Sequence, residues 1–297
     1  ETKIEARVVA QGGGTYKVLV RKIAADGSVS RVELKGETEG DAVGFAGNDG
    51  DAGWKCSYVA GSITGPCGEG CKLEIKRVEH VSPTMGRKPP QGAIVLLDGK
   101  PAMEEMVRAK GAAWDFSGKG AIGDDGSIQI PGGGMSSKRQ FEGSFEMHVE
   151  FMNPLRSSAH SQGRGNSGVF FPNGTEIQVL DSFGECTYEG GGCGGFYRYK
   201  DPDTMDVIES IKDNPQNKYT LASAPPLQWQ TYDVEYRVKK QDGKYTGKPL
   251  VTACHNGIKI HDKVEIRNDA KKGSFSFQDH GNPVRYRNIW VMPLEDK

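Results

Sequence analysis

Polar side chains of several kinds gather around one turn near the C-terminus of the chain. In residues 273–278, Phe275 and Phe277 alternate with polar residues, which is the period of a half-buried β-strand. An Asp-His pair and a Gly-Asn-Pro turn follow, and the next run carries two arginines two positions apart. The side chains around the turn are those of Gln278, His280, Arg285 and Arg287. Either they form a polar edge that water satisfies, or they form half of a site.

Two earlier strand patterns carry polar residues of the same kinds. His148 and Glu150 alternate with apolar residues in FEMHVEF, and Glu176 and Gln178 do so in TEIQVLD, which ends at Asp181. If one sheet presents all these side chains together, they line a pocket with carboxylate, amide, imidazole and guanidinium groups. Such a pocket suits a polyhydroxylated ligand, because each sugar hydroxyl needs both a donor and an acceptor. On a convex face the same residues would be ordinary solvated side chains.

Aromatic residues and three weaker motifs add further candidates. Tyr197, Tyr199 and Trp229 could offer a ring face to a sugar, although Trp229 also fits core packing at the start of a strand. Asn173 begins a formal glycosylation sequon. The DPDTMD run has oxygen ligands for Ca²⁺ but lacks the EF-hand glycine and terminal Glu. The chain contains no phosphate-binding loop and no nucleophile elbow.

Composition narrows the class of protein. The 297 residues favour one large or two unequal domains, and 41 glycines and 15 prolines favour short strands and turns over long helices. A net charge of −1 leaves no electrostatic footprint for nucleic acid, so we expect no nucleic-acid partner. No apolar run approaches the roughly 18 residues of a membrane span.

The six cysteines indicate an oxidising compartment. Cys186 and Cys193 flank a glycine-rich loop, and their spacing predicts a disulfide. One further pair is expected among Cys56, Cys67 and Cys71; a zinc site there would lack the doubled CxxC pattern. We therefore expect an extracytoplasmic protein, periplasmic or secreted, whose signal peptide is absent from this chain, which begins at Glu1.

The order of strand patterns predicts two domains. Residues 1–81 read as a small β-rich N-terminal domain, and residues 82–92, SPTMGRKPPQG, read as a linker. Residues 93–297 contain a short helix pattern at 101–111, followed by many short alternating strands. That series predicts an all-β, two-sheet sandwich or jelly roll.

Several of these motifs together resemble a known bacterial family. The runs GSFEMHVEF, GNSGVFF, TEIQVLDS, QTYDVEY and FQDHGNPVRYRNIWV occur in the order and spacing of the 3-keto-disaccharide hydrolase family, and the resemblance covers roughly residues 92–294. The N-terminal β-rich extension resembles that of planctomycete-type members. The resemblance implies a concanavalin-like jelly roll and action on glycosides whose 3-hydroxyl is oxidised to a ketone, so that the partner is a small carbohydrate.

The resemblance also implies a chemistry for the polar residues. A 3-ketone acidifies the C2 hydrogen, so a base can remove it and expel the aglycone, after which water adds to the enone. His280 or Glu176 could be that base, and Arg285 or Arg287 the group that stabilises the enolate. A divalent cation on Glu176 and His280 is an alternative to the arginines. Substrate-binding roles then fall to Gln178, Asp181, Gln278, Arg287, Glu150, His148 and Tyr197.

Two other function classes remain open at this point. The same polar face could bind carbohydrate without turnover, since this fold hosts many lectin-like binders. Alternatively, Glu150 and Glu176 could act as the paired carboxylates of a conventional glycosidase. The helix pattern at 101–111 and the insertions around 186–206 depart from the family pattern, so the sugar and the aglycone do not carry over.

Overall fold

The computed structural model describes most of the chain. The described residues are 3–68, 70–98, 114–115, 121–130, 132–184, 187–202, 205–207, 218–220 and 222–296. Within them every regular element is a strand, apart from one short 3-10 turn at Ser161–Gly163. The helix predicted at 101–111 lies outside the described residues. No helix of the described part is long and apolar enough to cross a membrane.

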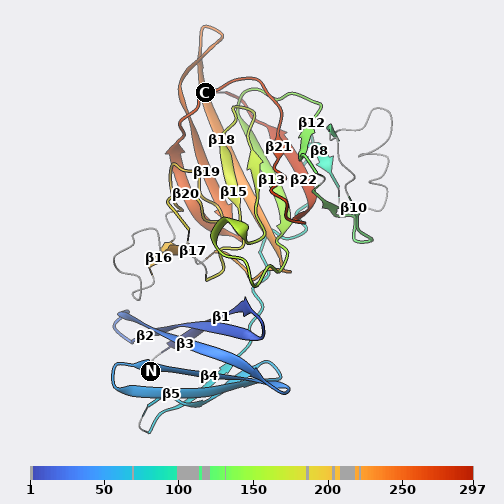
Figure 1. The fold of residues 1–297 in the computed structure, drawn as a ribbon. Coiled ribbons are helices and arrows are strands. Elements are labelled where there is room, and N and C mark those ends of the chain that lie inside the picture. The colour runs from blue at the N-terminus through green and yellow to red at the C-terminus, as the bar shows by residue number, and fades with distance from the viewer. Residues whose placement is uncertain are drawn as a thin grey trace.

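The N-terminal part forms a seven-stranded antiparallel sheet whose strands pair in sequence order (Figure 1). Its own hydrophobic cluster includes Val20, Leu34, Phe45 and Trp54. A Cys67–Cys71 disulfide closes the turn between its last two strands, which confirms the predicted pairing among three cysteines. The strands are β1 (Lys3–Gly12), β2 (Thr15–Ile23), β3 (Val29–Glu39), β4 (Ala42–Asp49), β5 (Ala52–Val59), β6 (Ser62–Pro66) and β7 (Lys72–Lys76).

The rest of the chain forms a two-sheet β-sandwich, the predicted concanavalin-like jelly roll. An eight-stranded sheet has the order β10-β11-β22-β13-β18-β19-β20, with β8 also pairing β22. Its strands are β8 (Ile94–Leu97), β10 (Ala121–Ile122), β11 (Ile128–Gln129), β13 (Phe145–Met152), β18 (Trp229–Gln241), β19 (Lys244–His255), β20 (Ile258–Glu265) and β22 (Arg285–Pro293).

The second sheet has five strands in the order β15-β14-β21-β12-β9. Its strands are β9 (Trp114–Asp115), β12 (Met135–Ser137), β14 (Ser167–Phe170), β15 (Glu176–Val179) and β21 (Ser276–Phe277). A separate two-stranded ribbon pairs β16 (Met205–Val207) with β17 (Lys218–Thr220). Between β19 and β20, Asn256 and Gly257 both have positive φ, as a type I′ hairpin turn requires.

Aromatic packing holds the two sheets together. The Phe145 ring stacks on Tyr236, with ring centroids 4.6 Å apart, and packs edge-to-face on Phe275 at 5.0 Å and on Phe171 at 6.0 Å. Phe145 and Tyr236 come from the eight-stranded sheet, while Phe275 precedes β21 of the other. The apolar side of each predicted alternation, such as Phe277 beside Gln278, therefore faces this shared core.

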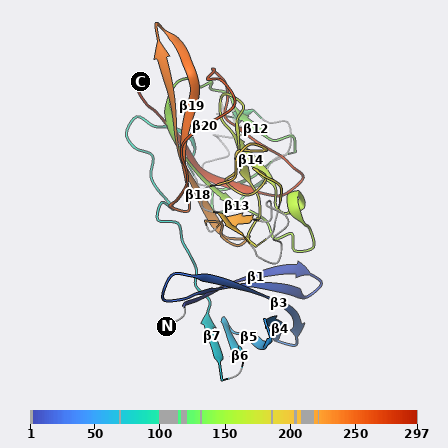
Figure 2. The ribbon, with the colours of Figure 1, turned by 90° about the vertical axis from the view of Figure 1, so that its left-hand side faces the viewer.

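The segment predicted as a linker is docked on the sandwich. Residues 82–88 lie along the outer face of the eight-stranded sheet, as the chain leading up from the N-terminal sheet shows in Figure 2. Thr84 Oγ1 donates to Asp233 Oδ2 at 2.6 Å, and the Gly86 N–H donates to Glu150 Oε1 at 2.6 Å. The Trp290 indole N–H donates to the Arg87 carbonyl at 3.2 Å. We call residues 82–88 the strap.

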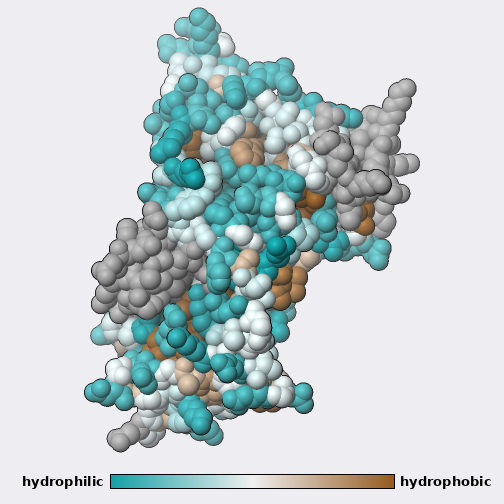
Figure 3. All heavy atoms as spheres, viewed as in Figure 1, coloured by the Kyte–Doolittle hydropathy of each residue, from teal (hydrophilic) through white to brown (hydrophobic). Residues whose placement is uncertain are grey.

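The N-terminal sheet also contacts loops of the sandwich. Arg164 Nη1 donates to the Ala10 carbonyl at 3.3 Å, and the Arg7 guanidinium lies 5.1 Å from the centroid of the Phe183 ring. A Cβ added to Gly184 would overlap Val9, so the backbone of the loop lies directly against β1. We propose the domain division 1–81, 82–92 and 93–297, which the two separate hydrophobic clusters support. The surface seen in Figure 3 is mainly hydrophilic.

Truncation of the central aromatic residue tests this account of the core. Phe145→Ala should lower the free energy of unfolding by about 3–5 kcal/mol, because it removes a buried ring and leaves a cavity. Urea unfolding followed by tryptophan fluorescence measures the change. Val59→Ala, at a side chain that is 52% exposed, is the control and should change the unfolding free energy by less than about 1 kcal/mol. An equal loss in both variants would contradict this assignment.

Candidate functional site

The residues predicted to converge lie on two opposite faces of the sandwich. Glu176, Gln178 and Gln278 belong to the five-stranded sheet and the segment that continues β21. The other four, His148, Glu150, Arg285 and Arg287, lie on the outer face of the eight-stranded sheet. The prediction that one face carries them all is therefore wrong. Alternation shows which side chains point away from the core, but it does not show which sheet a strand joins.

The outer face of the five-stranded sheet has a row of side chains centred on Glu176. In the strand register Glu176 pairs with Phe170, and Phe170 pairs with Ser276. On the other side, Tyr197 N–H donates to the Glu176 carbonyl at 3.2 Å, which places residues 194–197 beside β15 as an added edge. The next row holds Gln178 between glycines. This face therefore presents a carboxyl group beside amide groups and aromatic rings.

The Glu176 carboxyl is nearly buried and has no ion pair among the described residues. Its residue is 8% exposed, and the carboxyl bends over Gly168, where an added Cβ would overlap Oε1. Burial raises the pKa of Glu176 to about 7, because a charged carboxylate loses its hydration there. A carboxyl group that titrates near neutral pH can both accept and return a proton.

A glutamine holds this carboxyl in place. One end of the Gln178 amide lies 2.7 Å from the Ser167 carbonyl oxygen and 3.2 Å from Glu176 Oε1. Both neighbours accept hydrogen bonds, so this end is the nitrogen and donates to both. The other end lies 2.9 Å from the Gln162 side chain. The amide groups of Gln178 and Gln162 thus extend the polar face next to Glu176.

Two tyrosines and an arginine form the rim beside Glu176. Tyr197 Oη lies 2.6 Å from Tyr188 Oη, and the Arg198 guanidinium lies 5.4 Å and 5.6 Å from the Tyr188 and Tyr197 ring centroids. Burial, together with the hydrogen bond to Tyr197, raises the pKa of Tyr188. Sequence reasoning found Tyr197 but missed Tyr188 and Arg198. For Arg198 the available signal was the YRYK run at 197–200, since it alternates tyrosines with basic residues.

His280 lies at the exposed turn that follows β21, two residues after Gln278. The Asn282 amide donates to the His280 carbonyl at 2.9 Å, and the Gly281 N–H donates to Asp279 Oδ1 at 2.8 Å. Gln278 itself is tied to β14, because its N–H donates to the Gly168 carbonyl. The turn therefore positions His280 at the end of the strand that borders the Glu176 face.

Asp181 is engaged in a buried ion pair. Arg164 Nη2 lies 2.8 Å from Asp181 Oδ2, and the Phe183 N–H donates to Asp181 Oδ1 at 3.3 Å. Arg164 also donates to three backbone carbonyl oxygens, including that of Ala10 in the N-terminal sheet. Breaking a buried pair of this kind is costly, so Asp181 fits a structural role better than the predicted substrate-binding one.

The polar cluster on the eight-stranded sheet binds the strap. Glu150 accepts hydrogen bonds from Arg287 Nε at 2.7 Å, Asn288 Nδ2 at 2.8 Å and Gly86 N–H. Burial alone would raise the pKa of Glu150, but hydrogen bonds from His148, Asn288 and Arg287 outweigh it and lower the pKa to about 2. The strap thus covers a face that sequence reasoning assigned to substrate.

The two arginines proposed to stabilise an enolate have other partners. Arg285 Nη2 lies 3.2 Å from Asp125 Oδ1, and the Arg287 guanidinium lies 4.0 Å from the centroid of the Trp229 ring. Both arginines and Trp229 belong to the eight-stranded sheet. The sandwich core separates them from Glu176, which corrects their assignment as charge-stabilising or substrate-binding partners of that carboxyl.

One cysteine of the predicted Cys186–Cys193 disulfide, Cys193, is a free thiol. Cys193 is buried, and its Sγ lies 3.1 Å from Tyr232 Oη, against the prediction of a bond to Cys186. Cys186 itself lies outside the described residues. Burial raises the pKa of the Cys193 thiol to about 11, so it stays protonated at neutral pH.

Comparison with known proteins identifies the family. The sequence profile described as "3-keto-alpha-glucoside-1,2-lyase-like domain" matches residues 92–292, which comprise both sheets of the sandwich. The chain belongs to this family. A comparison with curated proteins gives no match.

A solved structure agrees with the family assignment. It is the crystal structure of "a putative glycosyl hydrolase from Parabacteroides distasonis ATCC 8503", 30% identical to this chain, with a TM-score of 0.51. The match covers 70% of this chain and 86% of that one. The two comparisons thus agree on a 3-keto-alpha-glucoside-1,2-lyase-like domain that shares its fold with a protein described as a glycosyl hydrolase.

The geometry of the lyase-like domain excludes Glu150 and Glu176 as a catalytic carboxylate pair. Glu150 and Glu176 lie on opposite faces of the sandwich, so they cannot flank one glycosidic bond as a conventional pair does. In the described part of the chain, no three His, Cys, Asp or Glu side chains lie together as a metal site. The divalent cation on Glu176 and His280 stays a prediction, and such a site would need ligands beyond these two.

The polar residues that contact the strap should make the free energy of unfolding depend on pH. Burial alone would lower the pKa of His148, but hydrogen bonds to Asp233 at 2.8 Å and to Glu150 outweigh it and raise the pKa. A raised histidine pKa stabilises the fold below about pH 6.5, and this contribution is lost as pH rises through the folded pKa. We therefore expect His148→Gln to destabilise the protein at pH 6 and to do so less at pH 9.

Urea unfolding of both proteins at a series of pH values checks this expectation. The difference between the two unfolding free energies cancels the titration of other groups. Glu142→Gln, at an exposed position, serves as the control. A difference between wild type and His148→Gln that stays constant from pH 6 to pH 9 would rule out a protonated His148 in the cluster.

Proposed function

We propose that this enzyme cleaves glycosides whose 3-hydroxyl has been oxidised to a ketone, by removing the C2 proton and expelling the aglycone from C1. The observation that carries the proposal is the buried Glu176 carboxyl with a pKa of about 7. It lies on an amide-rich and tyrosine-rich face of a 3-keto-alpha-glucoside-1,2-lyase-like domain. This group has the proton affinity that the first step needs.

The chemistry proceeds in two stages. The 3-ketone makes the C2–H acidic, and the base takes that proton while the electron pair moves into an enolate. The enolate collapses to form the C1–C2 double bond, the C1–O bond breaks, and the aglycone leaves as an alcohol after taking up a proton. Water then adds across the double bond at C1 and C2, which yields the free 3-keto sugar. The overall reaction is a hydrolysis with no net redox change.

The residues around Glu176 have complementary tasks in this proposal. Gln178 orients the carboxyl through its donated hydrogen bond, and the Gln278 amide offers a donor and an acceptor to sugar hydroxyls. Tyr197, Tyr188 and Arg198 replace the arginines of the other sheet as candidate donors to the enolate oxygen. His280 remains the alternative base, because it lies at the end of the strand that borders the same face.

A non-catalytic carbohydrate-binding function is the competing proposal, since the same face could bind sugars without turnover. Incubation with a 3-keto-glucoside and, in parallel, with the unoxidised glucoside separates the alternatives. Release of aglycone only from the keto form supports the proposal. Binding without release favours the binding module, and cleavage of the unoxidised glucoside would overturn the elimination mechanism. The same assay after chelation with EDTA tests the predicted cation.

Replacement of the proposed base gives a sharper test. Glu176→Gln should lower kcat for the 3-keto-glucoside by at least about 100-fold, because an amide cannot take the C2 proton. In wild type, kcat/KM should rise with pH up to about pH 7 and then level off, as the Glu176 carboxyl ionises. Exchange of the C2 hydrogen with D₂O, followed by NMR, reads the proton step directly.

Two control variants give this test its meaning. Glu142→Gln removes an exposed carboxyl elsewhere and should leave kcat unchanged. His280→Gln tests the alternative base: loss of C2 exchange in this variant, with exchange retained in Glu176→Gln, would transfer the role to His280.

The substitution Glu176→Gln should also change the free energy of unfolding in a pH-dependent way. The raised pKa of Glu176, about 7 against 4.5, means that the fold prefers the protonated carboxyl. Stability from this group is present below about pH 4.5 and is lost as pH rises towards 7. Glu176→Gln should therefore raise the unfolding free energy at pH 8, by up to about 3 kcal/mol, and hardly change it at pH 4.5. Equal effects at both pH values would contradict burial of a charged carboxyl.

An extracytoplasmic location is part of the proposal. The Cys67–Cys71 disulfide supports it, because such bonds persist mainly in oxidising compartments. A carbohydrate substrate of small size fits a periplasmic or secreted enzyme equally well.

A further inference from the structure

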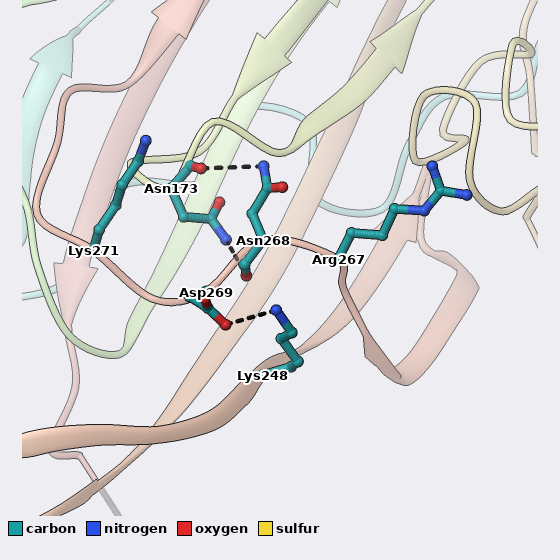
Figure 4. Close-up of a pocket in the computed structure, with 6 residues that line it drawn as sticks. All are labelled: Asn173, Lys248, Arg267, Asn268, Asp269 and Lys271. Atoms are coloured by element: carbon teal, nitrogen blue, oxygen red, sulfur yellow. Dashed lines mark hydrogen bonds and ion pairs between the residues drawn. The ribbon is translucent and has the colours of Figure 1, made fainter.

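A cationic pocket lies at one end of the sandwich, next to the loop that leads into β15. It has a volume of about 400 Å³, and Figure 4 shows Lys271 and Arg267 on either side of a pair of asparagines. Its lining residues are Asn173, Lys248, Arg267, Asn268, Asp269 and Lys271. Three of these side chains are positively charged and one is negatively charged.

The floor of the pocket is fixed by reciprocal hydrogen bonds. Asn173 Nδ2 donates to the Asn268 carbonyl at 3.1 Å, and Asn268 Nδ2 donates to the Asn173 carbonyl at 3.2 Å. Asn173 is 1% exposed, so its amide is occupied as a structural tie and is a poor glycosylation acceptor in the folded protein. Gly174 lies close to both Asn268 and Lys271, since a Cβ added to it would come within 4 Å of Asn268 Nδ2 and Lys271 Nζ.

The charges of the pocket are unbalanced. Lys248 pairs with Asp269 at 2.6 Å, which neutralises one cation. Among the described residues neither Arg267 nor Lys271 has a carboxylate partner, and Arg267 rests on the Tyr199 ring with its guanidinium 4.6 Å from the centroid. Two cations without a carboxylate partner therefore line a space that an anion can enter from the solvent. This donor set matches the oxygens of a carboxylate or a sulfate group.

The pocket adjoins the face that carries Glu176. Its floor residue Asn173 precedes Glu176 by three positions in the loop before β15. Tyr199, which supports Arg267, follows Tyr197 by two positions, and Tyr197 is the neighbour of Glu176 across the added edge. The pocket therefore lies beyond the end of β15 at which Glu176 stands, and Tyr199, which donates to the Glu265 carbonyl at 2.9 Å, lies beside its Arg267 side.

We propose that this pocket binds the anionic group of an acidic saccharide, a sulfate ester or a uronate carboxylate, in a unit attached to the sugar held at Glu176. The proposal deepens the proposed function and rests on it for the identity of the neighbouring sugar. The pocket selects negatively charged substrates through Arg267 and Lys271, while the Glu176 face carries out the chemistry.

Binding measurements without turnover test the pocket apart from the reaction. Isothermal titration calorimetry of the full chain uses a sulfated disaccharide, a glucuronate-containing disaccharide and the neutral disaccharide, each with Glu176→Gln in parallel. We expect at least about tenfold tighter binding of one or both acidic disaccharides than of the neutral one, in wild type and in Glu176→Gln alike. A preference for sulfate or for carboxylate identifies the anion.

Variants in the pocket locate the binding. Arg267→Ala and Lys271→Ala should each weaken binding of the acidic disaccharide by about tenfold, and Arg267→Lys should restore part of it. Lys272→Ala is the matched control, because this exposed lysine adjoins Lys271 in sequence but does not line the pocket. Its binding should equal that of wild type.

Three results would overturn the proposal. They are equal affinity for acidic and neutral disaccharides, an equal loss of binding in Lys272→Ala, and binding of inorganic sulfate without binding of either acidic disaccharide. Failure of the proposed function appears differently, as acidic-saccharide binding that depends on Arg267 and Lys271 without any turnover of 3-keto-glycosides. Turnover with no preference for acidic ligands would instead leave the catalytic proposal intact and remove this one.

Discussion

The packing of aromatic rings between the two sheets is the constraint on which the rest of the structure depends. Phe145 stacks on Tyr236 and meets Phe275 edge-on, so the two sheets share one dry core. Because every strand then turns its polar side chains outward, the molecule has two separate polar faces. Residues that look alike in sequence end on opposite sides of this core, and only one side carries Glu176.

The pKa of a buried carboxyl group is lowered on one face of the sandwich and raised on the other. Glu150 is surrounded by donors from Arg287, Asn288 and the strap, which keep it ionised with a pKa of about 2. Glu176 is nearly as buried, but it has no cation beside it in the described structure, and its pKa is about 7. The first arrangement stabilises a docked segment. The second leaves a carboxyl that can exchange a proton at neutral pH, which is what elimination at a 3-keto sugar requires.

The N-terminal sheet is attached to the sandwich by its own contacts and by the strap. Arg164 connects the Ala10 carbonyl to the buried Asp181, and Gln162, two residues before Arg164, contacts Gln178 on the proposed catalytic face. The N-terminal sheet therefore touches the sandwich close to a loop that reaches Gln178. The strap, which connects the N-terminal sheet to the sandwich, lies against the outer face of the eight-stranded sheet. The N-terminal sheet is therefore attached to the sandwich at two places.

Much of the fold followed from local patterns. Alternation predicted the strands around Phe145 and Phe277 and the two-sheet sandwich. Those features depend on neighbours in sequence, whose side-chain directions the strand period sets. The composition of the site, with Glu176 and Gln178 beside a Gln278–His280 strand end, also came from these patterns.

What the sequence by itself determined is the set of side chains that point away from the core; tertiary structure alone decided which of them meet. The assignment of β13 and β22 to one sheet and of β15 and β21 to the other depends on pairing between residues far apart in the chain. Alternation carries no information about such pairing, which is why Arg285 and Arg287 were assigned to the wrong face. The contact between Glu150 and the strap, like the burial that raises the Glu176 pKa, exists only after those long-range pairs have formed.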